Sequence, residues 1–365
     1  MKITVISGMF PPIKTGTSFY TRNLALALQK QNHLVEVITL GSIDLNEEKG
    51  LKVHRLKSIN IPLTGFFKHL RFCSFNILNW WRVYSILKNN RADVILVVNH
   101  YLDIIFLALF SSWLLKIPLI CSVGTQLQSI KRFRNHVLNI LDRLICGYLI
   151  FPFCDLIVAW DNQILQYLKD IHGSKIINKI KIVNYGVAGN TNDLLNKKKL
   201  YSYSGLILGV GAVSEQRSFV PLVQAFALLA NDFPSLKLKI IGHVYYEKAI
   251  HETQKMGIAN RVNFVGELAY EEVLDIMSSS DVFYSSLTGK YKGLGTASIE
   301  AMLLGVPCIV NIPNDLLGNG KLKNGVHFIQ SNDNIPCNIA TKIRTLLESE
   351  TKRYTIGQEG KAFVK

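Results

Sequence analysis

The sequence predicts an α/β protein made of two domains, each with a parallel sheet between helices. Two observations carry this prediction: short apolar runs rich in β-branched residues, and helical patterns of ten or more residues between most of them. Strands that alternate with helices in this way form parallel, Rossmann-like sheets. The length of 365 residues is too great for one small domain, and a hydrophobic content of 48% is enough for two cores.

The candidate strands fall into two sets, one in each half of the chain. The first set is Ile3–Ser7, Leu34–Leu40, Val94–Val98, Leu119–Val123, Leu156–Ala159 and Ile180–Val183. The second set is Leu206–Val210, Leu236–Ile241, Val262–Val265, Val282–Ser285 and Pro307–Val310. A polar, glycine-bearing stretch separates the two sets at Asn184–Ser204. We therefore predict an N-terminal domain at 1–185, a linker at 186–204 and a C-terminal domain at 205–365.

The sequence indicates a cytoplasmic protein without a membrane-spanning helix, a metal site or a cofactor. The longest charge-free apolar runs, Ile104–Leu115 and Leu144–Cys154, are shorter than the ~20 residues that cross a bilayer. The N-terminus lacks the pattern of a signal peptide. Cysteine, histidine and acidic residues do not cluster at metal-ligand spacing along the chain. Six cysteines in apolar surroundings are expected to be buried free thiols: Cys73, Cys121, Cys146, Cys154, Cys308 and Cys337.

Positive charge is concentrated in the first half of the chain. Of the net charge of +15, residues 1–190 contribute +12 (22 Lys/Arg and 10 Asp/Glu), and residues 191–365 contribute +3 (19 and 16). Nine basic residues and no acid lie between Lys49 and Ala92. A one-sided basic surface indicates a polyanionic partner, such as nucleic acid, anionic lipid or pyrophosphate.

One part of this basic region, Phe66–Lys88, has aromatic and aliphatic residues at helical spacing. It is either a core-facing helix with a solvated side or an interfacial helix whose cations meet lipid phosphates. A second basic cluster, Lys131–Arg134, opens another helical stretch that can share a face with the first. The two segments predict binding to an anionic membrane surface. Nucleic acid is not expected, because Trp, Phe and Leu interleave the basic residues and no nucleic-acid motif accompanies them.

Two loops that follow predicted strands suit the binding of a phosphate. The first loop carries Gly16 and Thr17 before a helix expected to start near Ser18, although most such loops are simple turns. The second loop, Gly209–Ser218, places Arg217 at a helix N-terminus. There its guanidinium binds a diphosphate or is simply solvated.

A third loop, after the predicted strand Val282–Ser285, carries the most informative pattern. Gly293, Leu294 and Gly295 precede a helix and can give backbone N–H groups to a diphosphate, which the helix dipole also favours. Glu300 follows two turns into that helix. Its carboxylate can accept hydrogen bonds from both hydroxyls of a ribose or lie at the surface.

Over nearly its whole length the chain resembles the family 4 retaining glycosyltransferases of GT-B fold. Phe10-Pro11-Pro12 with Gly16 resembles their N-terminal glycine loop, and Lys181–Val187 resembles the strand that closes their first domain. Arg261–Gly266 followed by Tyr270 resembles their base-binding turn. The most specific similarity is Glu300-Ala301-Met302 with Gly305-Val306-Pro307.

The resemblance implies two Rossmann-like domains facing across a cleft, and sugar transfer from a nucleotide-sugar with retention of configuration. The implied acceptor is a glycan or a lipid-linked or envelope-polysaccharide precursor at the cytoplasmic membrane face. An inactive relative that acts as scaffold for an active transferase is the alternative. An NAD-type oxidoreductase is disfavoured because its fingerprint glycines are missing. The donor-binding residues implied are Gly16, Thr17, Arg217, Gly293, Leu294, Gly295, Thr296 and Glu300.

The chain departs from the family pattern at positions that bear on catalysis. Lys292 stands where the first of two motif glutamates is expected, and Ala212 replaces one of two diphosphate-binding cations. Gly124 stands where a histidine is common. Lys292 can replace part of the lost positive charge. His100 follows the strand Val94–Val98 and either contacts an acceptor or is an ordinary loop histidine, so Lys292 and His100 are the two candidates for a catalytic role.

Overall fold

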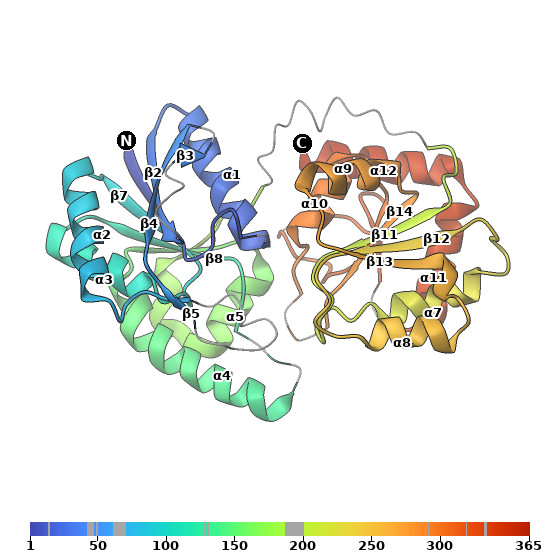
Figure 1. Ribbon diagram of the computed structural model, residues 1–365, viewed down its shortest axis with the longest axis horizontal. Coiled ribbons are helices and arrows are strands. Elements are labelled where there is room, and N and C mark those ends of the chain that lie inside the picture. The colour runs from blue at the N-terminus through green and yellow to red at the C-terminus, as the bar shows by residue number, and fades with distance from the viewer. Residues whose placement is uncertain are drawn as a thin grey trace. The chain divides into compact units, whose positions relative to one another are not determined.

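The chain forms two compact units, Met1–Ala188 and Gly189–Lys365, which are described one at a time. Of the predicted linker at 186–204, positions 187–200 lie outside the described residues. The computed structural model (Figure 1) describes residues 1–13, 15–41, 47–48, 50–60, 71–127, 129, 131–186, 201–288, 290, 292–318, 320–331 and 334–365.

The N-terminal unit is built on a sheet of eight strands in the order β10-β9-β8-β7-β1-β2-β4-β3. Seven strands run parallel, and β3 pairs antiparallel with β4. A separate antiparallel pair joins β5 (Ile59–Asn60) to β6 (Arg71–Phe72). The strands of the main sheet are β1 (Lys2–Ile6), β2 (Leu34–Leu40), β3 (Glu47–Glu48), β4 (Leu51–Leu56), β7 (Val94–Val98), β8 (Leu119–Val123), β9 (Leu156–Ala159) and β10 (Ile180–Ile182).

Helices cover both faces of this sheet, with α1 on one face and α2, α3 and α4 on the other (Figure 1). Helix α1 starts at Gly16 because the side chain of Thr15 caps it, accepting the N–H of Ser18. The helical elements are α1 (Gly16–Lys30), α2 (Ile77–Asn90), α3 (Ile105–Leu115), α4 (Arg132–Ile145), η2 (Cys146–Ile150), η3 (Phe151–Phe153), α5 (Asn162–His172) and η4 (Gly173–Lys179).

The C-terminal unit has a parallel sheet of six strands in the order β13-β12-β11-β14-β15-β16. Helices α7, α8 and α11 cover one face, and α9, α10 and α12 cover the other (Figure 1). The strands are β11 (Leu206–Val210), β12 (Lys237–Ile241), β13 (Val262–Gly266), β14 (Val282–Ser286), β15 (Cys308–Asn311) and β16 (Ile329–Gln330). The helices are α7 (Val220–Leu229), α8 (Lys248–Lys255), η5 (Ala259–Arg261), α9 (Tyr270–Ser279), α10 (Thr296–Leu303), α11 (Pro336–Leu347) and α12 (Glu350–Val364).

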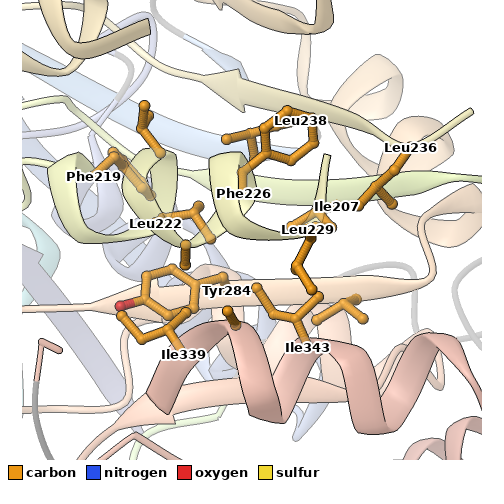
Figure 2. Packing of buried hydrophobic residues seen from close by; sticks show 14 of the residues in the cluster. Ile207, Phe219, Leu222, Phe226, Leu229, Leu236, Leu238, Tyr284, Ile339 and Ile343 are labelled. Carbon is orange, nitrogen blue, oxygen red and sulfur yellow. The ribbon is translucent and has the colours of Figure 1, made fainter. Parts of the chain in front are cut away.

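The core of this unit lies between the sheet and two helices that are distant in sequence. Figure 2 shows Leu222, Phe226 and Leu229 of α7 packed with Ile339 and Ile343 of α11 and with side chains from the strands. These five side chains are fully buried. Burial of such side chains contributes about 1.5–3 kcal/mol each, so this contact fixes the C-terminal end of the chain against β11 and β14.

The predicted fold class is confirmed, since all eleven predicted strands are present and each unit has a largely parallel sheet. Strand β4 was missed, although Leu51 and Val53 are buried and Lys52 is exposed, as alternation along a strand requires. Five of the six cysteines are buried free thiols as predicted; Cys337 is exposed.

The prediction of one helix over Phe66–Lys88 is wrong. Residues 66–70 lie outside the described part of the chain, Arg71–Phe72 forms strand β6, and the helix begins only at Ile77. The carboxylate of Asp103 accepts the N–H groups of Cys73 and Ser74, which holds these residues in a turn. The side chain of Asn76 then caps α2 by accepting the N–H of Leu78.

One stretch among the described residues, Arg132–Phe153, is long and apolar enough to cross a membrane by length and composition. It comprises α4, η2 and η3, and 22% of its apolar window is buried. Counting only charge-free runs missed it, because Asp142 and Arg143 interrupt the apolar residues. Asp142 is 1% exposed, so one side of this helix packs against its own unit.

Candidate functional site

The loops of the C-terminal unit converge where the strand order of its sheet reverses. Strand β11 lies between β12 and β14, so the connections that leave β11 and β14 diverge to opposite sides. Ligands of open α/β sheets bind beyond the carboxyl ends of the strands at such a reversal. The loop after β11 carries Arg217, and the loop after β14 leads to α10.

The Arg217 guanidinium lies directly over the backbone of Gly211. A Cβ built on Gly211 would be 2.2 Å from Nη1 of Arg217, and the φ of +135° also requires glycine. The turn is fixed by hydrogen bonds between Ser214 and Arg217 in both directions, at 3.1 Å each. Arg217 therefore sits in a turn ahead of α7, which starts at Val220, and not in its first turn as predicted.

Arg217 also has unmet capacity for hydrogen bonding. Its Nε atom has no hydrogen-bond partner among the described residues. Burial lowers the pKa of this guanidinium from its ordinary value. A half-buried cation whose buried Nε has no hydrogen bond among the described residues is a good partner for an anion.

The loop after β14 is tied to the Arg217 loop and to the next strand. Thr288 donates its N–H and its hydroxyl to the carbonyl of Gln216, at 2.8 and 3.0 Å. The Lys292 ammonium donates to Oδ1 of Asn311 at 3.3 Å, and the hydroxyl of Ser286 donates to Oδ1 of Asn334 at 2.7 Å. Asn311, at the end of β15, was not among the residues predicted from sequence.

The predicted diphosphate cradle, Gly293–Thr296, forms the entry to α10. Gly295 is the N-cap residue, with φ of 75°, and it supplies no side-chain hydrogen bond to the helix. The first N–H groups of a helix have no partner within the helix and attract anions. Leu294 is 3% exposed and anchors this loop. The four predicted residues are therefore together, beside Lys292.

Glu300 lies on α10 and is buried, with 7% of its surface exposed, so a surface position is excluded. The hydroxyl of Tyr270, the first residue of α9, donates to its Oε1 at 3.0 Å. Burial raises the pKa of Glu300 to about 7, and the hydrogen bond from Tyr270 lowers it by less. A buried carboxyl held by one hydroxyl retains a free oxygen for other hydroxyl donors. The role of Tyr270 as its partner was not predicted.

In the N-terminal unit, Gly16 and Thr17 form the first turn of α1, beyond the carboxyl end of β1. Thr17 is 9% exposed, and its hydroxyl accepts a hydrogen bond from the amide of Asn99 at 3.1 Å. The carbonyl of that amide accepts the N–H of Gly124 at 3.2 Å. Thus the loops after β1, β7 and β8 are joined through one buried asparagine.

His100 is fully buried, in contrast to both expectations for it. Its ring lies among Tyr101, Phe151 and Tyr167, with centroids 5.4–6.0 Å apart. Its Nε2 lies 3.4 Å from Oδ1 of Asp142. A side chain enclosed by these groups is neither a solvated loop histidine nor in reach of an acceptor. Sequence alone placed it at a strand end but could not show what covers it.

The chain belongs to the glycosyltransferase family 4 type. The model described as Glycosyltransferase Family 4 matches residues 15–188, and that described as Glycosyl transferases group 1 matches residues 190–363. The capsular polysaccharide biosynthesis glycosyltransferase CapM of Staphylococcus aureus is 25% identical over 251 residues, 65% of this chain and 63% of CapM. The alpha-monoglucosyldiacylglycerol synthase of Streptococcus pneumoniae is 23% identical over 326 residues, 85% of this chain and 71% of that protein. The chain thus matches less than two thirds of the length of CapM.

Solved glycosyltransferases share the fold. HepE of Anabaena in complex with UDP-glucose superposes with a TM-score of 0.75 at 16% identity, covering 100% of this chain and 94% of HepE. WaaG, a glycosyltransferase involved in lipopolysaccharide biosynthesis, gives a TM-score of 0.64 at 13% identity, covering 99% and 95%. The fold is therefore GT-B.

Proposed function

We propose that the protein transfers a sugar from a nucleoside-diphosphate sugar to an acceptor at the cytoplasmic face of a membrane, with retention of configuration. The observation that carries this proposal is the position of Arg217. Its guanidinium lies over Gly211 at the reversal of the strand order, with Nε unpaired among the described residues. A diphosphate beyond β11 would meet this cation on one side and the start of α10 on the other.

The rest of the donor follows from the neighbouring groups. Glu300 is placed to accept the hydroxyls of the ribose through the carboxylate oxygen that Tyr270 leaves free. Backbone N–H groups at Gly293–Thr296 are placed to bind the diphosphate oxygens. We assign no metal to this site, because Arg217, Lys292 and the helix N-terminus supply the positive field.

Transfer breaks the bond between the anomeric carbon and the diphosphate oxygen and forms a bond to the acceptor oxygen on the same face of the sugar. The proton of the acceptor hydroxyl passes to the departing diphosphate. Negative charge grows on that diphosphate in the transition state. Arg217 and the α10 N–H groups then contribute most to the rate, because preorganised donors stabilise developing charge.

The acceptor proposed is a lipid-linked or envelope-polysaccharide precursor. CapM is named for capsular polysaccharide biosynthesis, and the pneumococcal relative for synthesis of a glycolipid. The N-terminal unit exposes an apolar stripe along α4 and η2, preceded by the basic cluster Lys131–Arg134. Aromatic and aliphatic side chains next to cations suit the interface of an anionic membrane. The stripe residues, 39–82% exposed, are Phe133, Val137, Ile140, Leu141, Leu144, Ile145, Tyr148 and Leu149.

A second candidate function, an inactive scaffold for another transferase, is favoured by one observation. Lys292 occupies the position of a motif acid and is held by Asn311. A scaffold of this kind would bind an active enzyme and need no donor.

The decisive experiment measures donor binding and donor hydrolysis on the full chain. Calorimetry with UDP, GDP and ADP, followed by their sugar derivatives, is expected to show one nucleoside diphosphate binding with a 1:1 stoichiometry. Slow release of that nucleotide from its sugar, faster with anionic vesicles that carry extracted lipid acceptors, supports transfer. If the protein binds a nucleotide but neither hydrolyses nor transfers its sugar, the scaffold function is supported. If it binds none of the three nucleotides, both the donor site and the transferase function are refuted.

A further inference from the structure

A second polar cluster lies inside the N-terminal unit, in residues that the proposed transfer does not use. It brings together the loop after β7, the α4–η2 helix and α5. The five side chains are His100, Asp142, Cys146, Tyr167 and His172, and their exposed fractions are between 0 and 9%. Buried side chains of this type are rare unless they are paired or bind a cation.

The ligand atoms of three of these side chains lie close together. One atom each from His100, Asp142 and Cys146 lies within 4.8 Å of the other two. Nε2 of His172 lies 3.5 Å from Oδ2 of Asp142, opposite the 3.4 Å approach of His100 to Oδ1. The hydroxyl of Tyr167 donates to Asp142 and also lies 3.2 Å from Nε2 of His100, so it bridges two members of the cluster.

Several atoms of the cluster have no hydrogen-bond partner within the described part of the chain. They are Oδ1 of Asp142, Nδ1 of His100 and both ring nitrogens of His172. The approaches of the two histidines to Asp142 are close, yet their geometry does not satisfy Oδ1 or Nε2 of His172 as hydrogen bonds. Each buried polar atom left without a partner costs about 1–3 kcal/mol. The arrangement therefore lacks a group that would satisfy these donors together.

We propose that the cluster binds one Zn²⁺ ion, with His100, Asp142 and Cys146 as its protein ligands, while His172 lies against the other oxygen of the Asp142 carboxylate. Imidazole, carboxylate and thiolate in one enclosed site suit zinc better than magnesium or calcium, which take oxygen ligands. Binding displaces the thiol proton of Cys146 to solvent and leaves a thiolate on the metal. All three protein ligands are buried, so this ion is structural and does not take part in sugar transfer.

The local backbone fits such a role. Asp142 and Cys146 are four residues apart on one helical face, and at Cys146 the helix changes from α to π geometry. Next to it, a Cβ on Gly147 would lie 2.9 Å from Nδ1 of His172, so glycine lets the two helices approach closely enough for the histidine to reach the cluster. Zinc would fix the exposed helix α4–η2 to the loop after β7 that bears Asn99.

The test is made on untagged full-length protein, purified with and without added Zn²⁺ and analysed for metal content. We expect about one zinc per chain, which a strong chelator removes with a fall in the melting temperature that added Zn²⁺ restores. Co²⁺ in place of zinc is expected to show the thiolate charge-transfer band and the visible bands of a four-coordinate site. The proposal is overturned if the protein holds less than a tenth of a zinc per chain after loading and its melting temperature does not change. The cluster would then be a metal-free ion pair of histidine and aspartate.

Variants assign the ligands. Cys146→Ser is expected to remove the charge-transfer band and to weaken zinc binding at least tenfold, whereas the matched control Cys308→Ser, also a buried free thiol, keeps both. If Cys146→Ser does not fold, His100→Gln provides the same test through metal content and the cobalt spectrum. Stoichiometric zinc with an unchanged cobalt spectrum in every folded ligand variant would place the metal elsewhere and overturn the proposal.

Discussion

The indole of Trp160 occupies the space that a side chain at position 124 would fill. A Cβ built on Gly124 would lie 2.2 Å from Cε3 of Trp160. The indole N–H donates to the hydroxyl of Ser122 at 2.7 Å, and the ring centroid lies 3.9 Å from that of Tyr20 and 4.8 Å from that of Tyr185. Gly124 stands where the family resemblance implies a histidine, so the lost histidine and this tryptophan belong to one packing arrangement.

Gly124→Ala is expected to destabilise the protein by about 1–3 kcal/mol, because the added methyl group must displace a buried indole. Urea unfolding followed by tryptophan fluorescence and circular dichroism measures this change. In a Trp160→Ala background the same substitution is expected to cost much less, since the cavity accepts the methyl group. Gly186→Ala is the control, because no atom of the described residues lies within 4 Å of a Cβ there. Equal costs in the two backgrounds would show that the two positions are not coupled.

Arg217→Ala is expected to weaken binding of the preferred nucleoside diphosphate by about 1.5–3 kcal/mol, the scale of a hydrogen bond to a charged group. Binding of the nucleoside without phosphates is expected to change little. Calorimetry on the two ligands separates these effects. Lys248→Ala, which removes an exposed cation from α8 of the same unit, is the control. Equal losses for nucleoside and nucleotide would place Arg217 away from the diphosphate.

Glu300 makes the stability of the protein depend on pH. Burial raises its pKa from the ordinary 4.5 to about 7, so between these values the folded state binds more protons than the unfolded state. Stability must therefore fall as pH rises through this window. Glu300→Gln removes the free-energy cost of burying an ionised carboxylate. It is therefore expected to stabilise the protein by at most about 3 kcal/mol at pH 8 and by much less at pH 4.5. Chemical denaturation at both pH values checks this, with the exposed Glu271→Gln as control.

The same Glu300→Gln variant is expected to bind the nucleotide more weakly, because an amide oxygen accepts hydroxyl donors less strongly than a carboxylate. Gain of stability with loss of affinity is the pattern of a strained functional group. If Glu300→Gln changes the free energy of unfolding by the same amount at pH 8 and at pH 4.5, the folded protein ionises Glu300 at little cost in stability.

The strands could be predicted because each is a short run of β-branched and other apolar residues, such as Val94–Val98. Strands covered by helices on both faces of a parallel sheet have this composition. Strand β4 was missed because its basic residues were assigned to a charged tract. The start of α2 could not be predicted either. It depends on Asp103, which lies about thirty residues further along the chain and holds Cys73 and Ser74 in a turn.

The candidate site could likewise be predicted only in part from the sequence. Arg217 and Gly293–Gly295 stand in loops that follow strands, Glu300 lies on the helix that the second loop opens, and parallel strands bring such loops to one edge of the sheet. The contact of Tyr270 with Glu300 and the role of Asn311 were not predicted, because they arise from packing between α9 and α10 and from the neighbouring strand β15. The cluster around Asp142 could not be recognised from spacing along the chain, because His100 and Asp142 meet only when α4 folds against the loop after β7. The i, i+4 pair of Asp142 and Cys146 was the available signal.

Membrane binding is expected to depend on the apolar stripe of α4 together with its basic start. The double substitution Ile140→Ser and Leu144→Ser is expected to reduce binding to anionic vesicles at least tenfold, since both side chains are about half exposed. Leu228→Ser, which removes a similarly exposed leucine from α7, is the control. Wild-type protein is expected to dissociate as salt rises, because each basic residue near the surface contributes about 1 kcal/mol. Equal binding to neutral vesicles, or none to anionic ones, contradicts the interfacial role of α4.

Substitutions of Lys292 distinguish the proposed transferase function from the scaffold function. Its ammonium is held by Asn311 beside the diphosphate cradle, where it adds positive charge in place of the cation missing at Ala212. Lys292→Glu restores the acid of the family pattern but puts a negative charge next to the leaving diphosphate. We expect this variant to lose at least tenfold in kcat for transfer or donor hydrolysis, and Lys292→Gln to lose less because it only removes the charge. The exposed Lys290→Glu, two residues away in the same loop, is the control for the change in charge. If Lys292→Glu instead gains activity over wild type, the lysine marks a decayed site and the scaffold function replaces the transferase.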